Sequence, residues 1–133
     1  MNSPAHDTAL YLAALSAFGS FGGVAGWPVY VGREPLEPED VVTCYDTGGA
    51  PGPLIDLRKP TVQVRLRAES YNAGWQKINA AYEALVQPIA EAAPDVLILG
   101  WVPISEVAYI GRDDHDRALF TVNFEVMRDG ATA

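Results

Sequence analysis

The feature that most constrains the fold is a long apolar stripe in the middle of the chain. Its members recur at alternating intervals of four and three residues, which places their side chains on one side of an α-helix. They are Tyr71, Trp75, Ile78, Tyr82, Leu85 and Ile89. Ser70 to about Ala92 is therefore predicted to be the strongest helix of the chain, with Pro88 kinking it or ending it early. Such a stripe needs a second layer to cover it.

The stretch directly before this helix supplies a candidate for that layer. Between Thr61 and Ala68, apolar and polar residues alternate without a break. A period of two is typical of a half-buried β-strand, with one face packed and the other polar. Arg65 and Arg67 fall on the polar face of this strand.

The remaining segments complete the order helix, three strands, helix, three strands. Ser3 and Pro4 predict the start of a helix over residues 4–18. Strands are predicted at 27–32, 41–45 and 96–102, and a hairpin is predicted from 107–110 and 119–128 around a polar tip. Runs of adjacent strands favour an α+β fold. We expect a mostly antiparallel sheet of about five to six strands with two helices packed on one face, in a single domain spanning residues 1–133.

Composition excludes several classes of protein. The hydrophobic share of 49% is enough for a core, and no apolar run is long enough to span a bilayer. Residues 1–6 lack the basic start of a signal peptide. The net charge of −8 argues against a general DNA-binding module, since DNA affinity depends on neutralising phosphates. Cys44 is the only cysteine and is expected to be a buried thiol.

No metal or cofactor is expected from the sequence. The acidic run Asp113, Asp114, His115 and Asp116 consists of consecutive residues, whose side chains diverge and cannot all converge on one ion. We interpret this run as a solvated hairpin tip.

Asp46-Thr47-Gly48 is the sharpest short motif. It resembles the D-T-G turn of homodimeric retroviral-type aspartic proteases, in which two such carboxylates share one proton. Two long amphipathic helices have no place in those nearly all-β enzymes. The alternative is that residues 46–53 form a glycine- and proline-rich turn in which Asp46 acts as a cap.

Charge is unevenly distributed along the chain. Arg58, Lys59, Arg65 and Arg67 gather within ten positions, and a cluster of acidic residues precedes them in a proline-rich loop. One interpretation is an ordinary solvated sheet face. The other is a subunit contact, because a basic strip on one copy can pair with an acidic loop on the next, and such head-to-tail contacts can close into rings. The candidate interface residues are Arg58, Arg65, Arg67, Glu37, Glu39 and Asp40.

Several short motifs follow one another in a particular order between about residues 29 and 90. They are Val29-Tyr30-Val31-Gly32, Pro35, Pro38-Glu39-Asp40, Asp46-Thr47-Gly48-Gly49, the run from Lys59 to Arg65, Tyr71 and Ala73. The motifs are weak singly but more specific in their order and spacing. In that order they resemble the minor capsid and tail terminator (tail completion) proteins of tailed phages.

The resemblance implies a two-layer α+β fold and a structural role without catalytic residues. Such proteins form a ring, usually a hexamer, at the head-proximal end of the tail tube, where the ring stops tube polymerisation and joins the tail to the head connector. The implied partners are other copies of the chain, the tail tube protein and the connector or neck proteins. DNA would pass through the lumen without specific binding. The implied location is the virion, after assembly in the host cytoplasm. The open alternatives are the protease using Asp46 and another neck or tail-completion protein.

Overall fold

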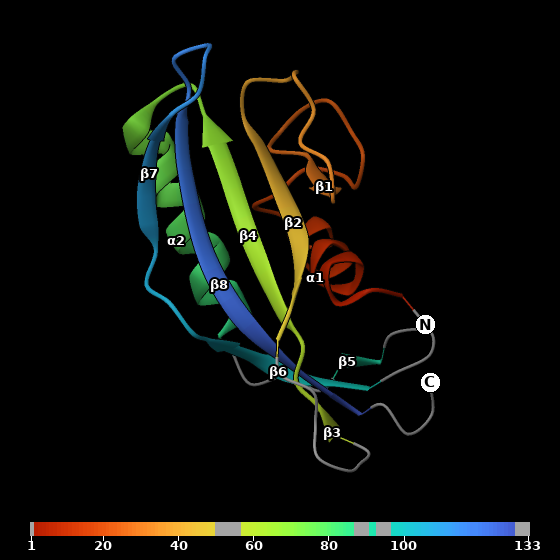
Figure 1. Ribbon diagram of the computed structural model, residues 1–133. Coiled ribbons are helices and arrows are strands. Elements are labelled where there is room, and N and C mark those ends of the chain that lie inside the picture. Colours follow the sequence, from red (N-terminus) through yellow and green to blue (C-terminus); the bar gives the residue numbers. More distant parts are fainter. Residues whose placement is uncertain (1, 50–56, 87–90, 93–96, 130–133) are drawn as a thin grey trace.

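The computed structural model describes residues 2–49, 57–86, 91–92 and 97–129 (Figure 1). The elements follow one another in the predicted order of helix, strands, helix and strands, and the predicted α+β class is confirmed. Their bounds are α1 Pro4–Ala13, β1 Val29–Val31, β2 Val41–Gly48, β3 Leu57–Arg58, β4 Thr61–Ala68, α2 Tyr71–Leu85, β5 Glu91–Ala92, β6 Leu97–Pro103, β7 Ala108–Arg112 and β8 Ala118–Asp129.

The sheet is built around β8, which is 12 residues long. Its main path runs β1-β2-β4-β8-β6-β5, and β3 and β7 also pair with β8. On one edge of β8 lie β4 and then β3, and on the other edge lie β7 and then β6 (Figure 1). Every pairing is antiparallel except β1 with β2, so the predicted mostly antiparallel sheet is confirmed.

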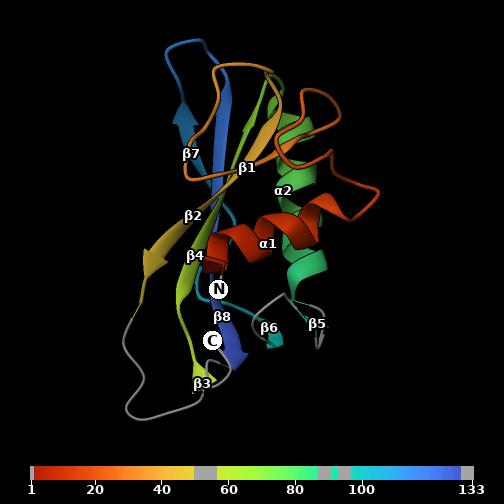
Figure 2. The ribbon, with the colours of Figure 1, turned by 90° about the vertical axis from the view of Figure 1, so that its right-hand side faces the viewer.

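Both helices lie on the same face of the sheet, as predicted (Figure 2). The alternating strands point their apolar side chains toward them, and the register places Val64 beside both Cys44 and Val122. The fully buried sheet residues under the helices include Val42, Cys44, Val62, Val64, Leu66, Phe120, Val122, Phe124 and Val126. The opposite face carries the polar side chains of β4 and β8 and is called here the open face.

Helix α1 begins as predicted but ends earlier. The Ser3 hydroxyl accepts a hydrogen bond from the amide of His6, and Pro4 occupies the first turn. The helix ends at Ala13 and not near Phe18, because tight turns follow it. In these turns the amide of Leu15 donates a hydrogen bond to the carbonyl oxygen of Leu12, and the amide of Phe18 donates to that of Leu15. These turns bring Phe18 into the core.

Helix α2 begins at its Ser70 cap and ends at Leu85, before Pro88, which lies outside the described residues together with Ile89. Ile78 and Leu85 are fully buried, as the stripe predicts. The prediction was wrong for Trp75, which is 42% exposed. At Gly74 the helix approaches the sheet so closely that a Cβ atom would lie 2.5 Å from a ring carbon of Phe120. The closest approach therefore runs through Gly74, and the Trp75 side chain beside it stays partly in solvent.

Candidate subunit interface

The candidate site lies on the open face, where a loop crosses the sheet. Because β1 and β2 run parallel, the chain must return to the starting end of the sheet between them. Residues 32–40 make that return, and their backbone meets the arginines of the open face. The crossover and the arginine strip are thus brought together within one chain.

Glu34 forms ion pairs with both arginines of β4. Its Oε2 lies 3.2 Å from Nε of Arg65, and its Oε1 lies 3.4 Å from Nη1 of Arg67. The two arginines are two residues apart on one strand, so their side chains point to the same face. One carboxylate between them offsets the repulsion of two neighbouring positive charges.

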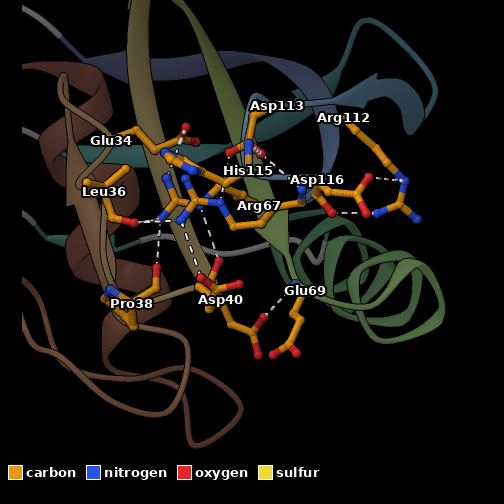
Figure 3. A network of polar contacts seen from close by, with 12 residues as sticks. Glu34, Leu36, Pro38, Asp40, Arg67, Glu69, Arg112, Asp113, His115 and Asp116 are labelled. Carbon is orange, nitrogen blue, oxygen red and sulfur yellow. Dashed lines mark hydrogen bonds and ion pairs between the residues drawn. The ribbon is translucent and has the colours of Figure 1, made fainter.

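Arg67 holds the crossover loop through three backbone carbonyls (Figure 3). Its Nε donates to the oxygen of Glu39 at 3.2 Å, and its Nη2 donates to Leu36 at 3.1 Å and to Pro38 at 2.6 Å. The residue is 2% exposed. Burial lowers the pKa of Arg67 from its ordinary value, and the Glu34 carboxylate opposes that shift. A guanidinium still keeps its charge at neutral pH, so Arg67 is a permanent donor that fastens the loop to the sheet.

Arg117, just before β8, holds the same loop from a second side. Its Nη1 donates to the carbonyl oxygen of Leu36 at 2.6 Å and lies 3.8 Å from Oε1 of Glu39. Its Nε donates to Oδ2 of Asp113 at 2.8 Å. The carbonyl of Leu36 therefore accepts from two buried arginines, which fixes the loop relative to both β4 and β8.

Asp113 organises the hairpin tip between β7 and β8. Its Oδ1 accepts from the amides of His115 at 3.0 Å and Arg117 at 2.9 Å. Burial alone would raise the pKa of Asp113, but the hydrogen bonds from Arg117 and His115 and the charge of Arg117 hold it below the ordinary value. The predicted hairpin tip is confirmed, and its first aspartate is structural.

The predicted interface residues occupy different environments. Arg67 is buried, whereas Arg65 is half-buried and Glu37 and Glu39 are exposed. Asp40 accepts from the amide of Glu69 at 2.9 Å, which ties the loop to the start of α2 (Figure 3).

Arg58 lies away from this group. It belongs to β3, which pairs with the distal end of β8, so the structure does not bring its backbone beside Arg65 and Arg67. The sequence pattern did not identify Arg117 as a partner of the loop, or Asp113 as the partner of Arg117. The register of β4 with β8 places Ala118 opposite Ala68 and thus Arg117 next to the end of β4, but this register is a tertiary result.

Asp46 does not lie in a turn, contrary to the prediction for residues 46–49. Asp46, Thr47 and Gly48 belong to β2, where the pairing with β4 shifts register between Asp46 and Gly48. Gly48 and Gly49 both have positive φ, which explains the glycines by backbone conformation. Residues 50–53 of the predicted turn lie outside the described residues.

The Asp46 carboxylate has a structural partner. Its Oδ1 accepts a hydrogen bond of 2.8 Å from the amide of Ala5, in the first turn of α1. A carboxylate at that position satisfies a helix amide and complements the helix dipole. The D-T-G motif is thereby accounted for by a strand irregularity and a helix cap.

Cys44 is fully buried as predicted, and burial, with the nearby Asp46 charge, raises the pKa of its thiol to about 12. Among the residues that the structure describes, no group of three or more His, Cys, Asp or Glu side chains is placed to hold a metal ion. Within the same residues, no helix is both long and apolar enough to cross a membrane.

Comparison with known proteins agrees with this architecture. Residues 10–129 match the family described as bacteriophage tail terminator protein, a span that runs from α1 into the last residues of β8. Comparison with curated protein sequences gave no match. The family is one of structural proteins of the phage tail, and the resemblance drawn from residues 29–90 is confirmed over a longer span. Given the match along nearly its whole length, this chain belongs to the bacteriophage tail terminator protein family.

Proposed function

We propose that the protein forms a ring, with six copies as the expected number, at the head-proximal end of the tail tube. There it stops tube polymerisation and joins the tail to the head connector. The observation that carries this proposal is the family match over residues 10–129. The role is structural, with no catalytic residue, and the protein resides in the virion after assembly in the host cytoplasm. Its partners are other copies of itself, the tail tube protein and the connector or neck proteins.

The crossover loop, residues 32–40, is held in place by hydrogen bonds, and this supports a role in docking. Two arginines and Asp40 fix the loop backbone, while the side chain of Leu36 and the carboxylates of Glu37 and Glu39 stay exposed. A surface that is ordered before binding loses less conformational entropy when a partner arrives. In the ring, Glu37, Glu39 and Asp40 of one copy meet basic groups of a neighbour.

The basic side of that contact is Arg65 together with Arg58. Arg67 has its donors engaged inside its own chain, so its part in assembly is to hold the acidic loop in position. Arg65 pairs with Glu34 but retains 31% of its side-chain exposure, which leaves it accessible to a neighbouring carboxylate. Rim contacts of this kind set orientation and association rate more than affinity.

The charge of −8 fits a ring through which DNA passes. Tight binding to DNA comes from neutralised phosphates and would hinder passage, whereas an acidic protein does not retain the duplex. DNA therefore passes through the ring without being bound specifically.

The direct test is polymerisation of purified tail tube protein from the same phage, followed by electron microscopy. Adding this protein should cap growing tubes with a ring at one end and stop further lengthening. In the phage, loss of the gene should yield overlong tubes and heads that are not joined to tails. Tubes that keep growing past bound protein, or normal particles without the gene, would contradict the proposal.

A charge-reversal series tests the electrostatic part of the proposal. Arg65→Glu should weaken ring formation because it places like charges opposite Glu37 and Glu39 of the neighbour. Combining Arg65→Glu with Glu37→Arg is the matched control, because this pair of changes restores opposite charges across the contact. Equal rings from both variants at moderate salt would remove Arg65 from the contact.

A further inference from the structure

One long segment of the chain has no charge. From Thr8 to Gly32 there is no Asp, Glu, Lys, Arg or His, although charged residues make up 20% of the chain. This segment holds most of α1, the loop after it and β1. Three large apolar side chains of this segment are exposed: Leu10, Phe21 and Val24. Val24 is 78% exposed. The ring of Phe21 lies 5.1 Å from that of His6, which is one helical turn from Leu10. We call Leu10, Phe21 and Val24 the β1 flank.

The opposite edge of the sheet carries a second exposed apolar surface. Tyr109 and Ile110 lie on β7, and Tyr71 and Trp75 lie in the first turns of α2. All four are between 41% and 49% exposed. The Tyr71 ring packs 5.0 Å from that of Tyr109, and both pack against the buried Phe120 at 5.4 and 5.5 Å. We call these four residues the β7 flank.

The β7 flank also includes a strand edge. Within the described residues β7 pairs with β8 and with no other strand, so its outer backbone groups face outward. The segments 70–76 and 107–111 that build this flank contain no charged residue. Natural proteins protect a free edge with charges or cover it, and this one has no charge within β7 before Arg112.

Both flanks have the composition of an interface core. Such cores are depleted in charged residues and enriched in aromatic ones, and ordered aromatic side chains supply much of the binding energy. Exposed acidic residues gather on the crossover loop and on the hairpin tip and include Glu37, Glu39, Asp114 and Asp116, while Glu69 and Glu106 border the segments of the β7 flank. The crossover loop between β1 and β2 and the hairpin tip between β7 and β8 lie at the same end of the sheet (Figure 1).

We infer that the β1 flank of one copy docks against the β7 flank of the next copy. This inference rests on the proposed ring and supplies its apolar contact. The occupant is a second copy because two chains that each carry a net charge of −8 repel one another least where their contact surfaces are apolar, and the residues of both flanks are uncharged. The flanks are different surfaces at opposite edges of one sheet, so the contact is head-to-tail and each copy can bind two neighbours.

The test introduces one negative charge into each flank. In Val24→Asp the charge enters the β1 flank, and in Ile110→Asp it enters the β7 flank; both side chains are exposed, so the fold is retained. Val102→Asp is the matched control, because Val102 is also apolar and 41% exposed but lies on β6, outside both flanks and outside the crossover loop. Sedimentation velocity over a concentration series should show wild type and Val102→Asp assembling together. Each flank variant should need at least about tenfold more protein to assemble.

Mixing the two flank variants tests the head-to-tail geometry. Each variant alone should be monomeric, but an equimolar mixture should form dimers, because one intact β1 flank can still meet one intact β7 flank. Self-association of Val24→Asp at the wild-type level, with no dimer gained on mixing, would show a contact of β7 with β7 and overturn the inference. Wild-type assembly by both variants would also overturn it while leaving the tail terminator function intact, since tube capping is measured separately. A wild type that stays monomeric at the highest concentration would overturn it as well.

Discussion

The two faces of the sheet are held to their neighbours by different forces. Under the helices, Val64, Phe120 and Leu85 are fully buried among apolar side chains. On the open face the crossover loop is held by the guanidinium groups of Arg67 and Arg117, which donate to backbone carbonyls. Apolar packing is non-directional and tolerates similar shapes, whereas hydrogen bonds to fixed carbonyls require a donor of defined geometry.

This difference predicts how each face responds to change. On the helix face, the cost of a substitution depends on the volume removed and on how far the core can close around it. On the open face, it depends on which buried polar groups lose a partner. Substitutions that separate these two mechanisms therefore test which force holds each face of the sheet to its neighbours.

The largest effect is expected on the helix face. Leu85→Ala should lower the free energy of unfolding by about 2–5 kcal/mol, because Leu85 is fully buried between α2 and the sheet. Leu36→Ala makes the same chemical change on the loop, where the side chain is exposed, and should change stability by about 0.5 kcal/mol or less. Urea denaturation of the two variants measures the difference. Equal losses would show that the α2 stripe is not part of the core.

The open face should respond strongly to loss of its buried donor. Arg67→Met removes the donor to the carbonyls of Pro38 and Glu39 and one of the two donors to the carbonyl of Leu36, and should cost about 2–3 kcal/mol. Amide hydrogen exchange in residues 33–40 should accelerate at the same time. Arg65→Met is the control, because its half-exposed pair with Glu34 contributes only about 1 kcal/mol or less. Equal losses of stability and equal exchange rates in the two variants would show that Arg67 does not hold the loop through its hydrogen bonds.

At Gly74 we expect an alanine substitution to destabilise the protein, although helix propensity alone predicts that it would stabilise it. Replacing a helical glycine by alanine normally stabilises a helix by about 1 kcal/mol. At this position the new Cβ would lie 2.5 Å from the Phe120 ring and 2.8 Å from the Cβ of Ala68. Gly74→Ala should therefore destabilise the protein by about 1–3 kcal/mol through overpacking. Thermal denaturation decides the sign, and a raised melting temperature would contradict the close approach of α2.

The smallest effect concerns the acid stability of the hairpin tip. The folded pKa of Asp113 is lowered, so the folded state binds fewer protons than the unfolded state near pH 4. Its contribution is fully present above the ordinary pKa and is lost as pH falls through the lower folded value. The stability difference between wild type and Asp113→Asn should therefore shrink with acidification. A difference that stays constant from neutral pH to about pH 2 would show that the Asp113 charge contributes nothing.

Much of the fold could be predicted because it depends on local periodicity. The alternation over Thr61–Ala68 predicted both ends of β4 correctly, and the apolar stripe predicted α2 correctly as far as Leu85. Period two and period 3.6 are properties of the backbone itself, so they can be recognised without knowing the neighbours. The end of α1 was less predictable, because it depends on where Phe18 enters the core.

The environments of Arg65 and Arg67 could not be predicted from their pattern. Both occupy polar positions of one strand, yet Arg67 is buried and Arg65 is not. The difference arises because β1 pairs in parallel with β2, which sends the crossover loop over Arg67. Strand direction depends on contacts across the sheet and leaves no periodic signal in the sequence.

By itself, the sequence determined the α+β class, the helices and strands with a periodic pattern, and the separation of charge between segments. Only the tertiary structure decided which charges meet within one chain and which stay exposed. Asp46 illustrates the division, since its motif predicts a turn, while its carboxylate binds the amide of Ala5, 41 positions earlier in the chain. Side-chain patterns report the period of the local backbone, whereas partners distant in sequence are set by how the layers pack.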